Sequence, residues 1–235
     1  MLVYCNVAFE DVTYEQGEAP EYSRQQWEVV KNDLGLDFPN LPYFIHKDVR
    51  ITETLAIMKY IAAKWEPLLL GKTSDDIGTV EMVAGVLCTI KNDVTMPCYQ
   101  TDNRERLAQT ATKKIAPIAE HLRKDDKEYL VGSYVTYVDF ILMEQLELIM
   151  FITEDRLAVE HPVLEAYLLR MKSLPQLHEY MANNEDLKVR PFNNKVAKIN
   201  NYEEIKREIE LDDLEHAVDD AIEGKIETPA ESSEQ

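Results

Sequence analysis

The chain has 235 residues, of which 45% are hydrophobic and 29% are charged, and its formal net charge at neutral pH is −19. This length is sufficient for one large domain or two small ones, and the composition is that of a globular protein. The excess of negative charge argues against binding to nucleic acid or to an anionic membrane surface, since both require a positive footprint. It permits a basic protein partner.

Neither a membrane span nor a metal site is expected. The longest apolar runs are far shorter than the roughly 20 residues that a helix needs to cross a bilayer, and the first residues do not resemble a signal peptide. The three cysteines, Cys5, Cys88 and Cys98, are an odd number without metal-ligand spacing. They fit the cytoplasm or a similar reducing compartment, where a free cysteine behaves as a small hydrophobe.

The negative charge is concentrated near the C-terminus, where residues 200–235 hold 13 acidic and three basic residues. Apolar residues recur here at intervals of four or five, which predicts an acidic amphipathic helix over 199–224. Its apolar positions are Ile205, Ile209, Leu214, Val218 and Ile222. Residues 225–235 have the composition of a disordered tail. Two interpretations stay open: a solvated, solubilising segment, or a helix that engages a basic protein partner or a larger assembly.

The first part of the chain alternates between strand and helix patterns. Apolar and polar residues alternate over 8–14, which predicts a strand ending near Tyr14, and a loop with Gly17 and Pro20 follows. The remaining predicted elements, in chain order, are a short helix over 23–35, strands over 41–45 and 49–51 joined by a tight turn, and a helix over 55–65. The order is strand, helix, strand, strand, helix.

No strand pattern is evident after Asp75, and helical spacing continues to about residue 183. The helical patterns cover 75–99, 104–125, a stretch within 129–152, 161–175 and 177–183. Thr136 and Asp139 have the spacing of a capping box at the start of the third helix, and Pro162 suits a first helical turn. The chain therefore divides near 66–75 into an α/β part over 1–66 and an all-α part over 75–198.

Two sequence stretches together resemble the cytosolic glutathione transferases. The stretch "FPNLPYFIHKDVRITETLAIMKYIA" resembles their glutathione-binding half, and "GSYVTYVDFILMEQLELI" resembles the capping-box helix of their helical half. The stretches "QGEAPEYSRQQW" and "GLDFPNLPY" are most similar to the mu class. The resemblance implies a thioredoxin-like α/β domain followed by an all-α domain, usually assembled as a two-fold homodimer.

The resemblance also implies where glutathione binds. The family holds a cis peptide bond at the position of Pro42, an isomer nearly confined to X–Pro bonds. There the backbone of Leu41 would pair with the tripeptide as an added strand does. Thr54, at the start of the next helix, would hold the γ-glutamyl carboxylate, since free N–H groups at a helix start favour an anion. Glu53 would pair with the γ-glutamyl ammonium.

Four further positions match family contacts. Trp27 and Lys31 match residues at the glycine end of glutathione, Asn40 matches a contact to its cysteinyl part, and Tyr99 matches a tyrosine that faces the electrophile. Each expectation has a structural alternative. Trp27 and Tyr99 can serve as packing residues, Lys31 as a solvated charge, and Thr54 as a helix cap.

One family residue has no counterpart in this sequence. In the family a first strand and a first helix carry a tyrosine whose hydroxyl stabilises the glutathione thiolate. The stretch "LVYCNVAFEDVTYE" corresponds to the end of that helix and the second strand, so the chain begins too late to include the tyrosine, and Tyr4 aligns elsewhere. Three explanations stay open: an incomplete sequence, occupation of the strand position by "MLVYCNV", or another chain that fills it.

Two hypotheses for function follow. The first is a non-catalytic or weakly active glutathione-binding scaffold protein that engages a protein partner; Thr89, which stands where mu enzymes carry an aspartate that reaches across the dimer, supports it. The alternative is an active mu-like transferase that conjugates glutathione to electrophiles and whose N-terminus lies outside this sequence. Glutathione is the expected ligand or substrate in both, and we assign no catalytic residue and no metal.

Overall fold

The computed structural model describes residues 1–124, 127–154, 156–183, 192 and 194–200. Residues 1–200 belong to one compact unit, and residues 201–235 form a separate unit that lies outside the described residues. The predicted acidic helix and tail fall almost wholly on that second unit. No helix in the described part is long and apolar enough to cross a membrane.

The N-terminal part of the fold is built on a β-hairpin. Its elements are α1 (Gln25–Glu28), β1 (Tyr43–His46), β2 (Val49–Thr52) and α2 (Thr54–Trp65). The strands pair antiparallel, with Tyr43 opposite Thr52 and His46 opposite Val49. Lys47 adopts a positive φ of 56° in the turn between them. The two predicted strands, the tight turn and the following helix are therefore confirmed.

The predicted strand over 8–14 is wrong, because the described residues contain a single sheet of two strands, β1 and β2. Residues 8–14 have no regular secondary structure, and residues 8–13 are exposed. The alternating pattern predicts a strand, but a strand forms only with a hydrogen-bonding neighbour. Residues 1–7 form a turn in which the Cys5 N–H bonds the Met1 carbonyl at 3.0 Å, and they do not form a strand either.

The predicted helix over 23–35 is much shorter than expected. Only Gln25–Glu28 is α-helical, and the chain continues in turns to Gly35, whose φ is +67°. Ser23 accepts a hydrogen bond from the Gln25 N–H at 3.2 Å. A helix of one turn gains little from its own hydrogen bonds, so contacts of its buried Trp27 hold it in place.

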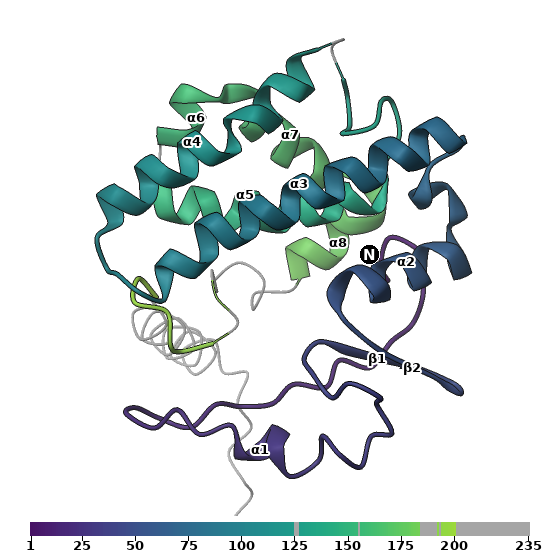
Figure 1. Cartoon of the computed structure of the whole chain (residues 1–235). Coiled ribbons are helices and arrows are strands. Elements are labelled where there is room, and N and C mark those ends of the chain that lie inside the picture. The colour runs from purple at the N-terminus through teal and green to yellow at the C-terminus, as the bar shows by residue number, and fades with distance from the viewer. Residues whose placement is uncertain (125–126, 155, 184–191, 193, 201–235) are drawn as a thin grey trace, which may run out of the picture. The chain divides into compact units, whose positions relative to one another are not determined.

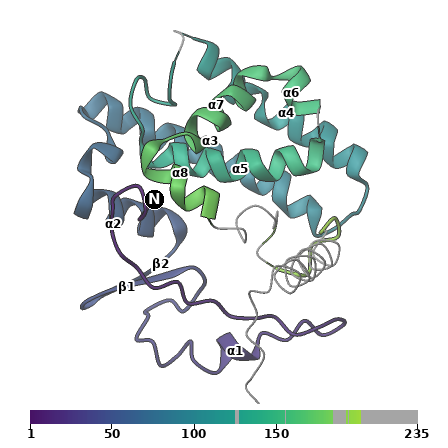
Figure 2. The same cartoon turned by 180° about the vertical axis from the view of Figure 1, so that it is seen from behind.

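The rest of the described chain is helical, as predicted. After a 3-10 turn, η1 (Pro67–Leu70), come α3 (Ser74–Cys98), α4 (Arg104–Arg123), α5 (Tyr137–Thr153), α6 (Arg156–Glu160), α7 (Pro162–Lys172) and α8 (Pro175–Asn183). The short α6 was not predicted. Figures 1 and 2 show the long helices α3, α4 and α5 side by side from opposite directions.

Helix α5 is the centre of the helical part. It contacts α3, α4, α6 and α7, and it also touches α2. Its side chains are buried almost all round, including Leu142, Leu146 and Ile149. A helix that is apolar on every side belongs inside a protein rather than on its surface. Helix α4, in contrast, buries a single stripe that includes Leu107, Ala111 and Ile115.

Helix α5 begins at the predicted capping box of Thr136 and Asp139. The Asp139 carboxylate accepts hydrogen bonds from the Thr136 N–H at 2.7 Å, the Leu130 N–H at 2.9 Å and the Tyr167 hydroxyl at 2.6 Å. Burial raises the pKa of Asp139, while these hydrogen bonds act in the opposite direction. This one carboxylate therefore joins the start of α5 to the preceding loop and to α7.

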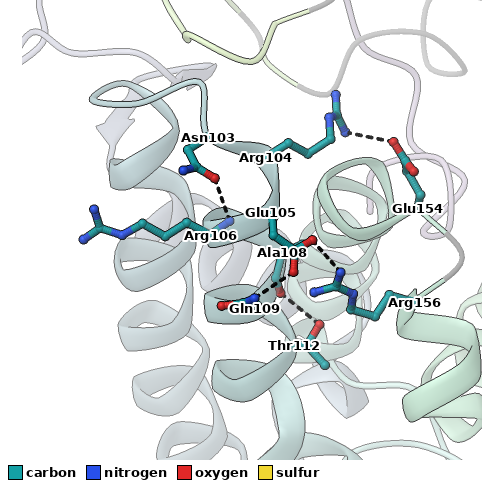
Figure 3. Close-up of polar contacts among 9 residues, drawn as sticks. All are labelled: Asn103, Arg104, Glu105, Arg106, Ala108, Gln109, Thr112, Glu154 and Arg156. Atoms are coloured by element: carbon teal, nitrogen blue, oxygen red, sulfur yellow. Dashed lines mark hydrogen bonds and ion pairs between the residues drawn. The ribbon is translucent and has the colours of Figure 1, made fainter.

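Polar contacts on the surface join the other helices. Figure 3 shows the start of α4, where the Asn103 side chain accepts from the Arg106 N–H at 3.0 Å. Glu105 pairs with Arg156 of α6 at 2.6 Å, and Arg104 lies 4.0 Å from Glu154 after α5. These contacts attach α4 to the junction of α5 and α6.

A second junction attaches α2 to the helical part. Glu81 of α3 accepts from the Lys59 ammonium of α2 at 2.7 Å and from the Tyr137 hydroxyl of α5 at 3.0 Å. Through Glu81, helix α2 is therefore attached to the helical part.

We predict that Asp139→Ala lowers the free energy of unfolding by about 3 kcal/mol, because it leaves two buried N–H groups and the buried hydroxyls of Thr136 and Tyr167 without their partner. Urea unfolding followed by circular dichroism measures this change. The matched control is Asp93→Ala, which removes only the 2.5 Å ion pair with Lys114 near the surface and should cost less than about 1 kcal/mol. Equal losses in the two variants would contradict the central role of Asp139.

Candidate functional site

The start of α2 offers an open position for an anion. Thr54 is the first residue of the helix and its side chain is exposed. The preceding residue, Glu53, occupies the N-cap position and makes no side-chain capping bond, and the first turn contains no acidic residue. No described residue bonds the Thr54 hydroxyl, so Thr54 does not act as a cap. The free N–H groups of this first turn therefore favour a negatively charged ligand.

Glu53 and Asn40 lie together beside Thr54. The Asn40 side-chain amide donates to the Glu53 carboxylate at 3.4 Å, and both residues are exposed. Glu53 has a φ of +71°, a conformation that is costly for any residue other than glycine and that is concentrated at functional sites. A carboxylate, an amide and a helix N-terminus thus meet within one small surface.

Leu41 provides an unpaired backbone position next to this group. The Leu41–Pro42 peptide bond is cis, as the family resemblance implied. Leu41 is exposed and lies two residues before β1, and no backbone hydrogen bond joins it to another described residue. Its N–H and C=O remain open to an extended peptide.

Trp27 is a packing residue in this structure. Only 3% of it is exposed, and its ring stacks on Tyr43 with centroids 5.9 Å apart and an interplanar angle of 15°. Tyr14 packs edge-on against the same indole at 5.3 Å. No described residue accepts a hydrogen bond from the Trp27 indole. A ligand contact through this N–H stays a prediction.

Lys31 pairs with a neighbouring carboxylate. Its ammonium forms an ion pair with Glu28, three residues earlier, and the hydrogen bond and charge of Lys31 lower the pKa of Glu28. The structure thus agrees with the structural alternative for Lys31, a charge balanced on the surface. Its contact to the glycine end of a ligand stays a prediction.

Two tyrosines near Trp27 were not singled out by the sequence analysis. The hydroxyls of Tyr14 and Tyr43 hydrogen-bond each other at 2.9 Å. Burial, followed by the bond to Tyr14, raises the pKa of Tyr43 to about 12. In the sequence, Tyr14 ends the alternating pattern over 8–14 and Tyr43 lies in the predicted strand over 41–45. Neither position indicates that the two side chains meet.

Tyr99 lies at the other end of the helical part, at the C-terminus of α3. Its hydroxyl accepts a hydrogen bond from the Asn194 side chain at 2.7 Å, and Phe192 packs edge-on against its ring at 5.9 Å. No described contact joins Tyr99 to Thr54, Glu53 or the residues around them. The described contacts therefore bring together Asn40, Leu41, Glu53 and Thr54, and they do not connect Tyr99 to this group.

Comparisons with known proteins agree with this arrangement. The model for the glutathione S-transferase N-terminal domain matches residues 1–63, and the model for the glutathione S-transferase C-terminal domain matches residues 90–184. Glutathione S-transferase Mu 1 of Rattus norvegicus is 32% identical over 204 residues, which cover 86% of this chain and 91% of that protein. Glutathione S-transferase Mu 3 of Homo sapiens is 29% identical over 202 residues, which cover 86% of this chain and 88% of that protein.

Solved structures give the same result for the fold. The glutathione S-transferase Blo t 8 superimposes with a TM-score of 0.74 and 25% identity, over 84% of this chain and 91% of that structure. A Pi-class glutathione S-transferase of Onchocerca volvulus superimposes with a TM-score of 0.66 and 19% identity, over 82% of this chain and 88% of that structure. The fold is a thioredoxin-like N-terminal domain followed by a helical C-terminal domain, and the chain belongs to the glutathione S-transferase family, in which it is mu-like.

Proposed function

We propose that this protein binds glutathione at the start of α2. Thr54 holds the γ-glutamyl carboxylate, Glu53 pairs with the γ-glutamyl ammonium, and Leu41 pairs its backbone with the cysteinyl residue next to Asn40. The observation that carries this proposal is the exposed Thr54 hydroxyl, which has no described partner, at a helix start without a capping side chain.

The charges of this surface support that orientation. The γ-glutamyl end of glutathione carries one carboxylate and one ammonium on the same carbon atom. The helix start supplies N–H groups for the carboxylate, and the Glu53 carboxylate, which bonds only the neutral Asn40 among the described residues, supplies the opposite charge for the ammonium. A simple anion would be repelled by Glu53, whereas a zwitterion is attracted at both positions.

The proposal includes weak conjugating activity for the sequence as it stands. Efficient transfer requires a hydroxyl that stabilises the thiolate, and several tyrosines of the N-terminal part already have other contacts. Tyr14 and Tyr43 bond each other, and Tyr60 bonds His46 at 2.8 Å. Tyr4 packs edge-on against Phe140, and burial raises its pKa.

The second candidate is a fully active mu-like transferase. The 32% identity to a protein named glutathione S-transferase Mu 1, over 86% of this chain, favours it. This candidate requires the thiolate-stabilising tyrosine to lie upstream of Met1 in the native protein. A partner bound through 199–224 stays a prediction, because most of that segment lies outside the described residues.

We predict that Thr54→Ala weakens glutathione binding at least about tenfold, because it removes a hydrogen bond to a charged group. Isothermal titration of both proteins with glutathione measures the change. Thr54→Ser keeps the hydroxyl and serves as the matched control, with affinity close to that of the parent chain. Unfolding curves of the three proteins should coincide, and unchanged binding by Thr54→Ala would place the site elsewhere.

Steady-state conjugation of glutathione to an aryl halide separates the two functional candidates. For a chain that starts at Met1 we expect a kcat far below about 1 s⁻¹, which is the lower end of typical enzyme values. Turnover above that value by this chain would refute weak activity. If mass spectrometry of the native N-terminus finds residues before Met1 and the longer protein is active, the second candidate is correct.

The homodimer belongs to the proposal as well. On α3, Met82 is 59% exposed and Val86, one helical turn later, is 40% exposed. Gly85 lies beside them, and apart from its neighbours and its own helix backbone no described atom lies within 4 Å of the place where a Cβ would stand. An apolar stripe with room for close approach suits the self-complementary contact of a two-fold dimer.

Met82→Glu should convert a dimer into a monomer, because it places a charge in the proposed contact. Size-exclusion chromatography with light scattering gives the mass directly. Val159→Glu is the matched control, since Val159 is a 79% exposed apolar residue on α6 and should not alter the mass. A monomeric parent protein, or a dimeric Met82→Glu variant, would refute this interface.

A further inference from the structure

A small cavity lies between the C-terminal end of α4 and α7, two helices that contact each other. Its volume is about 190 Å³, and its apolar wall consists of Leu122 from α4 and of Val163, Ala166 and Tyr167 from α7. Val163 lies three residues before Ala166 and four before Tyr167, so these side chains share one face of the helix. A cavity of about 150 Å³ with apolar walls holds a benzene molecule. The space between α4 and α7 is therefore sufficient for a single aromatic ring.

Basic side chains form the rest of the lining. They are Arg123, Lys127 and Arg170, and no acidic side chain of the described residues lines the cavity. The whole chain has a net charge of −19, so three cations around one apolar cavity give this place the opposite local charge. Asp125 and Asp126, between Arg123 and Lys127 in the sequence, lie outside the described residues. The cation of the cavity that stands apart from this loop is Arg170 of α7.

Arg170 retains hydrogen-bond donors for a ligand. One of its guanidinium nitrogens donates to the Glu128 backbone carbonyl at 2.6 Å, and no carboxylate of the described chain forms an ion pair with it. A guanidinium has five N–H donors, and two of them can hold both oxygens of one carboxylate. Arg170 is therefore equipped to bind a carboxylate at this cavity.

Arg123 is a second donor at the same cavity. Its guanidinium pairs with Glu120 at 2.5 Å, but the side chains of Arg123 and Glu120 are 39% and 71% exposed. Ion pairs between exposed side chains contribute little to stability. Arg123 can therefore exchange this partner for a bound anion at small cost.

We propose that this cavity binds a small carboxylic acid with one aromatic ring, in its ionised form. The ring packs against Leu122, Val163 and Ala166, and the carboxylate pairs with Arg170 and Arg123. None of these residues belongs to the position proposed for glutathione. The proposal therefore stands or falls independently of the proposed function.

Tyr167 connects the cavity to the interior of the helical part. Its ring lines the cavity, and its hydroxyl donates to the buried Asp139 carboxylate at 2.6 Å. The cavity requires the packing of α7 on α4, so the acid binds the folded chain and not the unfolded one. The acid should accordingly raise the temperature of unfolding as its concentration increases.

Isothermal titration of the full chain with benzoate tests the proposal. We expect saturable binding with a dissociation constant of about 1 mM or lower. Benzamide has the same ring without the charge, and acetate has the charge without the ring, so both should bind at least about tenfold more weakly. No measurable binding of benzoate at millimolar concentration would overturn the proposal, and so would equal binding of benzamide or acetate.

Two substitutions locate the binding. Arg170→Gln removes the charge, and Ala166→Leu fills the cavity while leaving every charge in place; each should weaken benzoate binding at least about tenfold. Arg106→Gln is the matched control, since Arg106 is exposed on α4 and does not line the cavity. Unfolding curves of the variants without benzoate should coincide with that of the parent protein. Benzoate bound elsewhere, for instance at the start of α2, would be insensitive to both substitutions, and that result would overturn the proposed site.

Discussion

The fold depends on the buried carboxylate of Asp139. It accepts hydrogen bonds from the N–H of Thr136, just before α5, and from the N–H of Leu130 in the preceding loop, and it also accepts one from the Tyr167 hydroxyl of α7. Helix α5 contacts α3, α4, α6 and α7, so a change at its first turn affects a helix against which four others pack. Tyr137, the first residue of α5, donates a hydrogen bond to Glu81 of α3, which also accepts one from Lys59 of α2. The proposed glutathione position at the start of α2 is thereby connected to the same helix.

Features with local sequence signals could be predicted. The long helices follow from apolar spacing, the capping box from a threonine and an aspartate three residues apart, and the start of α7 from Pro162. The strand over 8–14 could not be predicted correctly, because its alternating pattern reports side-chain preference and says nothing of a neighbouring strand. Helix α1 was overestimated because the prediction relied on Ser23 and Gly35 as end signals, whereas the residues between Glu28 and Gly35 include the weak helix formers valine, asparagine and aspartate.

In the candidate site, too, some residues could be predicted from the sequence and others could not. Asn40, Leu41, Glu53 and Thr54 lie close together in the sequence, at the two ends of one hairpin, so a motif identifies them together. The pairing of Tyr14 with Tyr43 joins residues 29 apart, and that of Lys195 with Glu18 joins residues 177 apart. Contacts between residues so far apart leave no spacing pattern in the sequence, so they can be seen only in the folded chain. The contacts of Tyr99 are of the same kind, since its partners Asn194 and Phe192 come from near the end of the described chain.

The central claim is that glutathione binds at the start of α2, and an NMR titration tests it most directly. Addition of glutathione to the ¹⁵N-labelled chain should shift the backbone amides of Thr54 and Leu55, where the carboxylate meets the helix, together with the amide of Leu41. The amides of α6, which lies in the helical part, should not move. Shifts confined to other surfaces, or no shifts at millimolar glutathione, would contradict the account.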